Sequence, residues 1–158
     1  MTPRRRPRPV ALVLISIFSV QLGASVAKGL FDEITPTAMM WLRLLTSAVL
    51  ITAVARPALR GRSRSDWLTV IGFGISLGLM NWAIYQSFAR IPLGVAVTIE
   101  FIGPLTVAVA LSRRARDLIW VVLAAAGVLL LGFDRTALDP WGVALALLAG
   151  AAWGAYIL

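Results

Sequence analysis

The chain has 158 residues, of which 59% are hydrophobic and 14% charged, and its net charge is +8. Its mean hydropathy of +0.87 is too high for a soluble domain of this size, so the composition indicates an integral membrane protein. The chain contains no cysteine and no histidine, which argues against a disulfide framework, a metal site and a nucleophilic hydrolase. Its arginines lie in short loops rather than on one folded surface, which argues against nucleic acid as a partner. We therefore expect no metal and no cofactor.

Six apolar stretches follow a basic N-terminus at residues 1–9. A helix of about 20 residues is about 30 Å long, which matches the hydrocarbon thickness of a bilayer. The predicted fold class is therefore all-α, a polytopic transmembrane helical bundle. The first stretch, after its arginines, also fits a secretory signal, but further spanning segments follow it. The predicted segments are 10–30, 36–55, 67–88, 91–111, 118–133 and 141–158.

Basic residues fall mainly on one side of this predicted topology. With the N-terminus in the cytoplasm, eleven of the fifteen Lys and Arg residues lie in cytoplasmic segments. An asymmetry of this size predicts a multi-pass protein with a cytoplasmic N-terminus. The eleven residues are Arg4, Arg5, Arg6, Arg8, Arg56, Arg60, Arg62, Arg64, Arg113, Arg114 and Arg116.

The segment 91–111 carries one acid, Glu100, near its middle. A charged side chain at that depth costs about 2.5–3.5 kcal/mol, whereas about ten large apolar residues each return about 0.3–0.6 kcal/mol, so the segment should insert with little margin. Pro104 cannot donate to the Glu100 carbonyl, which predicts a kink beside the carboxyl group. Gly103 would let another backbone come close. Together these features indicate a proton or ion site.

Polar residues of four segments are predicted to share one layer of the membrane. Arg43 and Glu100 both lie about seven residues into inward-running segments, or about 10 Å below the outer surface. Gln21, Asn81 and Tyr85 reach a similar depth from outward-running segments. We expect Glu100 and Arg43 to serve proton or ion coupling. Gln21, Asn81, Tyr85 and Glu100 would bind the substrate.

Structural roles for the same residues remain alternatives at this point. Arg43 and Lys28 can extend toward the interface, and amide side chains can join helices at about 0.6 kcal/mol each. A purely structural pair between Arg43 and Glu100 is another alternative. Two glycine pairs, Gly74 with Gly78 and Gly150 with Gly154, favour helix packing rather than a site. Glu100 remains a candidate functional residue under each of these alternatives, because an acid inside a membrane indicates function by default.

The order of the segments predicts an internal repeat. Five segments form an odd-numbered unit that begins inside and ends outside, so a second copy starting at 141–158 would have inverted orientation. Residues 10–133 would then form the first repeat, and the sixth helix would begin a second repeat that is cut short. Partners would be the lipid bilayer, a small polar substrate, and either the missing second repeat or a dimer partner.

Four blocks carry a resemblance to a known family: QLGASVAK at 21–28, WLRLLTSAVLI at 41–51, a long block at 74–114 and ALALLAGAAWGAYIL at 144–158. In these blocks the sequence resembles the EamA-type drug/metabolite transporters, and among them the threonine/homoserine exporters. The resemblance implies ten helices in two inverted five-helix repeats, a central cavity and a bacterial inner-membrane location. It also implies proton-driven efflux of amino acids or related metabolites. This chain would hold about half of such a transporter.

The hypothesis is a secondary active exporter working by proton antiport, in which Glu100 alternates between protonated and ionised forms. One alternative is a small multidrug-type pump working as a dimer, and another is a membrane subunit that transports nothing. A membrane enzyme is not expected, because the cytoplasmic loops offer only Asp66 and Asp117 among arginines.

Overall fold

The computed structural model describes residues 9–57, 61–112, 119, 122–123, 125–127, 130 and 138–158. Within these residues the named elements are all helices and there is no strand, which confirms the all-α prediction. The predicted segment 118–133 lies largely outside the described residues. The helices are α1 (Pro9–Gly29), α2 (Pro36–Ala55), α3 (Arg64–Phe88), α4 (Leu93–Glu100), α5 (Ile102–Leu111) and α7 (Pro140–Ile157).

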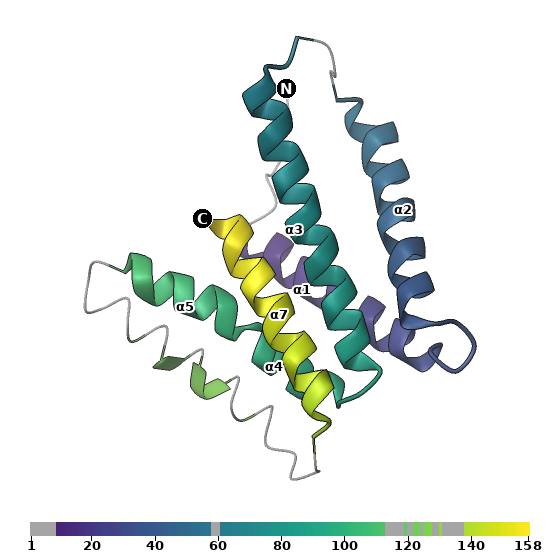
Figure 1. Cartoon of the computed structure of the whole chain (residues 1–158), viewed down its shortest axis with the longest axis vertical. Coiled ribbons are helices and arrows are strands. Elements are labelled where there is room, and N and C mark those ends of the chain that lie inside the picture. Colours follow the sequence, from purple (N-terminus) through teal and green to yellow (C-terminus); the bar gives the residue numbers. More distant parts are fainter. Residues whose placement is uncertain are drawn as a thin grey trace, which may run out of the picture.

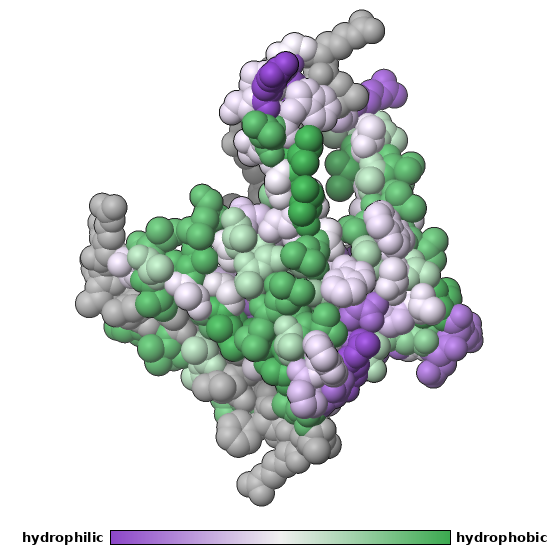
Figure 2. Space-filling model, in the orientation of Figure 1, coloured by the Kyte–Doolittle hydropathy of each residue, from purple (hydrophilic) through white to green (hydrophobic). Residues whose placement is uncertain are grey.

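Five stretches of helix are long and apolar enough to cross a membrane: α1, α2, α3, the pair α4–α5, and α7. Their large apolar side chains face outward, as Phe18 at 70% and Val54 at 85% exposure illustrate. Hydrophobic residues cover much of the visible face in Figure 2, and hydrophilic residues gather toward its ends. Exposed apolar surface on this scale is stable in lipid and not in water, so the chain is a multi-pass membrane protein.

The helices begin at short polar caps. Thr35 accepts a hydrogen bond from the Ala38 amide ahead of Pro36, and Asp139 caps α7 in the same way ahead of Pro140. The Ser63 and Asp66 side chains form a reciprocal capping box, so α3 begins at Arg64, three residues before the predicted start at 67. The sequence analysis had assigned these three residues to a solvated loop because of their arginine and serine content.

The fourth crossing is broken next to Glu100. Helix α4 ends at Glu100 and α5 begins at Ile102, with Phe101 between them. Pro104 has no amide hydrogen and leaves the Glu100 carbonyl without its helical donor, which accounts for the break. Helix α7 crosses there: a Cβ added at Gly150 would lie 2.6 Å from the Glu100 carbonyl oxygen, and one added at Gly103 would overlap the Gly150 carbonyl. The two backbones therefore touch, as glycines allow.

Helix α7 packs against α3, α4 and α5 (Figure 1). Its buried residues are all small: Gly142, Ala146, Ala149, Gly150, Ala152 and Gly154. Two serines of α3 donate to its backbone, Ser76 to the Ala152 carbonyl and Ser87 to the Gly142 carbonyl, each at 2.8 Å. The sixth crossing is thus a structural part of the unit formed by the preceding helices.

Helices α1 and α2 form a hairpin that buries few side chains. Among their described side chains only Ala24, Ala27 and Met40 are buried. The glycines of α3 also differ from the prediction, because a Cβ at Gly74 or Gly78 would meet nothing within 4 Å in the described structure. These two glycines form no close helix contact there, so the proposed packing role for them is wrong.

We predict that Gly103→Ala destabilises the protein, because the new methyl group would overlap the Gly150 backbone. Overpacking of this kind costs about 1–3 kcal/mol. Gly78→Ala is the matched control: it adds the same atoms in open space and improves helix propensity. Thermal unfolding in detergent measures both variants. Equal melting temperatures for the two variants would contradict the close approach of α5 and α7.

Candidate functional site

One cavity of about 500 Å³ lies among α1, α2, α3, α7 and the α4–α5 break. Most of its lining is apolar, from residues such as Ile17, Leu77 and Val97. Besides Ser16 and Trp153, its lining residues with polar side-chain groups come from four helices. They are the residues that the sequence analysis assigned to one layer: Gln21, Arg43, Asn81, Tyr85 and Glu100.

Arg43 binds Tyr85 rather than Glu100. Its Nη1 donates to the Tyr85 hydroxyl at 3.0 Å, and its guanidinium carbon lies 5.9 Å from the centre of the same ring. Within the described residues the ion pair found is Arg90 with Asp139, and Arg43 makes none with Glu100. The structural Arg43–Glu100 pair considered above is therefore absent. Arg43 also does not simply extend toward the interface, because Tyr85 holds it on the cavity wall.

Tyr85 is fixed by its surroundings, since it is 1% exposed. Its ring packs against Phe31 at 6.1 Å and Phe88 at 5.8 Å between ring centres. A buried hydroxyl needs a hydrogen-bond partner, which Arg43 supplies. The α3 helix thus presents a rigid acceptor that orients the arginine of α2.

Glu100 is the last residue of α4 and is 7% exposed. It lines the cavity at the helix break, with no ion-pair partner within 4.0 Å among the described residues. An ionised carboxylate in such a place costs several kcal/mol in desolvation unless a counter-charge or a proton compensates it. The position therefore suits a group that binds a proton or a cationic part of a ligand.

The amide side chains of Asn81 and Gln21 differ in burial and in hydrogen bonding. Asn81 is 9% exposed, and its Nδ2 donates to the Leu77 carbonyl one turn back at 2.9 Å. Gln21 lies on the exposed side of α1 at the cavity edge. Asn81 is thus oriented by its own helix, whereas the Gln21 amide is accessible to a ligand.

The sequence analysis missed the aromatic end of the cavity. Phe101 and Trp153 pack edge to face at 5.1 Å between ring centres, and both line the cavity. Trp153 comes from α7, which the sequence analysis treated only as the start of another repeat. The sequence could have indicated Trp153 as a cavity residue, because a tryptophan between Gly150 and Gly154 lies on the side of the helix that packs closely.

Lys28 also differs from its prediction. Instead of extending into the interface, it donates from Nζ to the Ile91 carbonyl at 2.9 Å. It thereby joins the end of α1 to the turn between α3 and α4. As for metal, the described helices and connectors hold no group of three or more Asp or Glu residues close enough to bind an ion.

Comparison with known proteins finds bacterial relatives that align with 153 residues of this chain. It is 43% identical to the threonine/homoserine exporter RhtA of Salmonella typhimurium strain LT2 and 42% identical to that of Escherichia coli strain K12. Each alignment covers 95% of this chain and 52% of the relative. The chain thus spans about half the length of the curated relatives it matches. No family model matches the chain. No solved structure matches it either.

We predict that Arg43 and Tyr85 are energetically coupled. A double-mutant cycle with Arg43→Met and Tyr85→Phe should give a coupling free energy of about 0.5–3 kcal/mol, because each single change leaves a polar group without its partner. Unfolding of the purified protein in detergent gives the four free energies. A cycle between Arg43→Met and Ser76→Ala, on a different pair of helices, should be additive. Additivity for Arg43 and Tyr85 as well would contradict the hydrogen bond.

Proposed function

We propose that the protein is part of a secondary active transporter that exports amino acids of the threonine/homoserine kind, or related small metabolites, by proton antiport. The observation that carries this proposal is the cavity in which a cationic and an anionic side chain, Arg43 and Glu100, lie apart without pairing. The similarity to named threonine/homoserine exporters supports it. In this proposal the protein is no enzyme, and its cavity binds and releases its ligand unchanged.

The separation of the two charges suits a zwitterion. The guanidinium of Arg43, oriented by Tyr85, would bind the carboxylate of an amino acid through charge-assisted hydrogen bonds. The amides of Gln21 and Asn81 would bind polar groups of its side chain. The cavity volume of about 500 Å³ lies in the range of small-molecule sites.

Glu100 would couple export to the proton gradient. Its side chain lines the cavity at the Pro104 break. Binding of a proton removes the desolvation cost of the charge, and its release restores that cost. A group of this kind can exchange a proton for substrate in each transport cycle.

The whole transporter would contain a second, inverted five-helix repeat, as in the EamA-type architecture. Two observations support this arrangement: the relatives are about twice as long as the alignment, and α7 is already packed into the first unit. The second repeat would complete the cavity wall. A dimer of short chains and a subunit that transports nothing are the alternatives, and similarity to longer exporters over 95% of the chain favours the repeat.

We predict that Glu100→Gln uncouples export from the proton gradient. The amide keeps the size and polarity of the side chain but cannot take up and release a proton. The measurement is threonine and homoserine transport by the full-length protein in proteoliposomes, with and without a pH gradient. Glu33→Gln, an exposed acid in the α1–α2 connector, is the matched control and should retain full gradient dependence. An equal pH response of both variants would refute the assignment of Glu100.

We also predict a cytoplasmic N-terminus in the bacterial inner membrane, since the arginine-rich segments should remain inside. A single cysteine replacing Pro57, in the α2–α3 connector, should react with an impermeant maleimide only after the cells are opened. A cysteine replacing Asp32, in the α1–α2 connector, should react in intact cells. The opposite pattern would reverse the topology.

A further inference from the structure

The described helices fall into two groups with different kinds of contact. Helices α3, α4, α5 and α7 form a block that is held by backbone approach at Gly103 and Gly150 and by the serine contacts of α3. Helices α1 and α2 form a hairpin, in which α2 packs against α3 of this block while α1 makes few close contacts with it. The cavity lies between the hairpin and the block, since Gln21 and Arg43 line one side and Asn81 and Glu100 the other.

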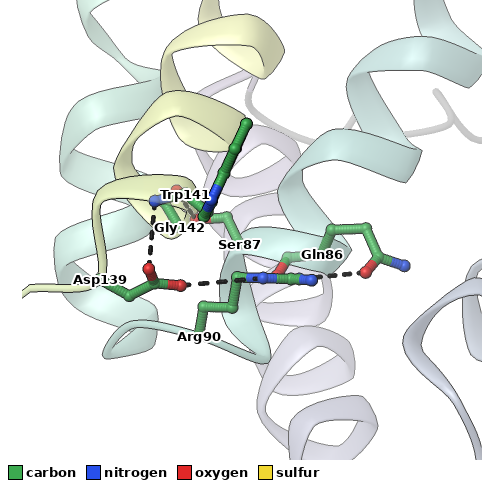
Figure 3. A network of polar contacts seen from close by, with 6 residues as sticks. All are labelled: Gln86, Ser87, Arg90, Asp139, Trp141 and Gly142. Atoms are coloured by element: carbon green, nitrogen blue, oxygen red, sulfur yellow. Dashed lines mark hydrogen bonds and ion pairs between the residues drawn. The ribbon is translucent and has the colours of Figure 1, made fainter.

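A relay of polar contacts crosses the end of the bundle at which α3 turns into α4 (Figure 3). Asp139 caps α7 and pairs with Arg90, at 3.8 Å between Oδ2 and Nε. Nη1 of Arg90 donates to the Gln86 carbonyl at 2.7 Å and to Gln86 Oε1 at 3.1 Å. Gln86 Nε2 in turn donates to Thr37 Oγ1 at 2.8 Å. The relay therefore runs from the block to the first turn of α2.

A second contact joins the same end of the bundle to α1. Lys28, in the last turn of α1, donates to the Ile91 carbonyl in the α3–α4 turn. We name two of the bonds between hairpin and block, Gln86 to Thr37 and Lys28 to Ile91, the latch. A third bond, from Arg43 to Tyr85, lies beside the cavity. The α3–α4 turn, which accepts the Lys28 bond, is tightly held, because a Cβ at Gly142 of α7 would lie 2.7 Å from the Ile91 side chain.

The opposite half of the hairpin buries no side chain and is joined to the block by the bond of Arg43 to Tyr85. No described residue of α1 before Ala24 or of α2 after Met40 is buried, and α3 has no buried residue before Asn81. The cavity nevertheless reaches into this half, since Ser16 and Leu77 line it. The bundle is thus closed around the latch, and hairpin and block are less tightly packed toward the arginine-rich ends.

We propose that the latch is a gate on the outer side of the cavity, and that the hairpin moves away from the block at this end to release substrate. The inference rests on the proposed transport function and on a cytoplasmic N-terminus. The latch is suited to reversible opening, because Thr37, Gln86 and Lys28 are only partly buried, so that water can replace each broken hydrogen bond. The glycine contacts within the block have no such replacement, so the block should move as one body.

Thiol labelling in the full-length protein tests the gate without relying on transport. In a background otherwise free of cysteine, Ala24→Cys places a thiol in the closed part of the cavity, where Ala24 is 3% exposed. An impermeant maleimide is added to intact cells, and the labelling rate is measured. Thr37→Val and Lys28→Met each remove one bond of the latch. Each should raise the rate at least about threefold, the population shift expected from the loss of one hydrogen bond.

Glu33→Gln is the matched control, since it removes a charge at the same end without touching the latch, and it should leave the rate unchanged. Labelling of a cysteine at Pro57 in opened but not in intact cells verifies that each variant is inserted, and thermal unfolding in detergent verifies that it is folded. The two latch variants lie on different helices, so one misfolded variant leaves the test intact. Rates equal to the parent in Thr37→Val and Lys28→Met would overturn the gate. Faster labelling without transport of any amino acid would uphold the gate and refute the proposed function.

Discussion

The structure depends on one backbone contact, between the broken fourth crossing and α7. Pro104 removes the donor that the Glu100 carbonyl would have in a continuous helix, and Gly150 lets the α7 backbone approach that carbonyl. Any larger residue at Gly103 or Gly150 would separate the two helices. Inside a membrane, such approach through small residues is a main source of helix association, because lipid competes equally well for apolar side chains.

This contact also determines where the carboxyl group of Glu100 lies. Because α4 ends at this residue, its side chain leaves the helix at the break and lines the cavity rather than facing lipid. The same break brings Phe101 next to Trp153 of α7. The acid and the aromatic wall of the cavity are therefore positioned by one local feature, the proline four residues after Glu100. A change in the packing of α7 would therefore move both the Glu100 carboxyl group and the aromatic wall.

Features that depend on local sequence could be predicted well. Segment 36–55 has the same bounds as α2, and the break follows from Pro104, because hydropathy and the missing proline donor act within one helix. Contacts between helices could not be predicted from the same patterns. Arg43 reaches Tyr85 rather than Glu100, and Lys28 reaches a carbonyl, because side-chain partners depend on helix rotation, which hydropathy does not specify. The packing of α7 against α3, α4 and α5 was missed for the same reason.

The distribution of contact types also bears on where a protein of this kind can change shape. Backbone packing at Gly103 and Gly150 lies deep in the bundle, where a separated peptide group would face hydrocarbon and lose several kcal/mol. The bonds of Thr37 and Lys28 lie at its end, where water can take their place. Arg43 and Tyr85 are intermediate, since their bond lies beside the cavity. Motion is therefore least costly along the boundary between hairpin and block, which is also where the candidate binding residues face one another.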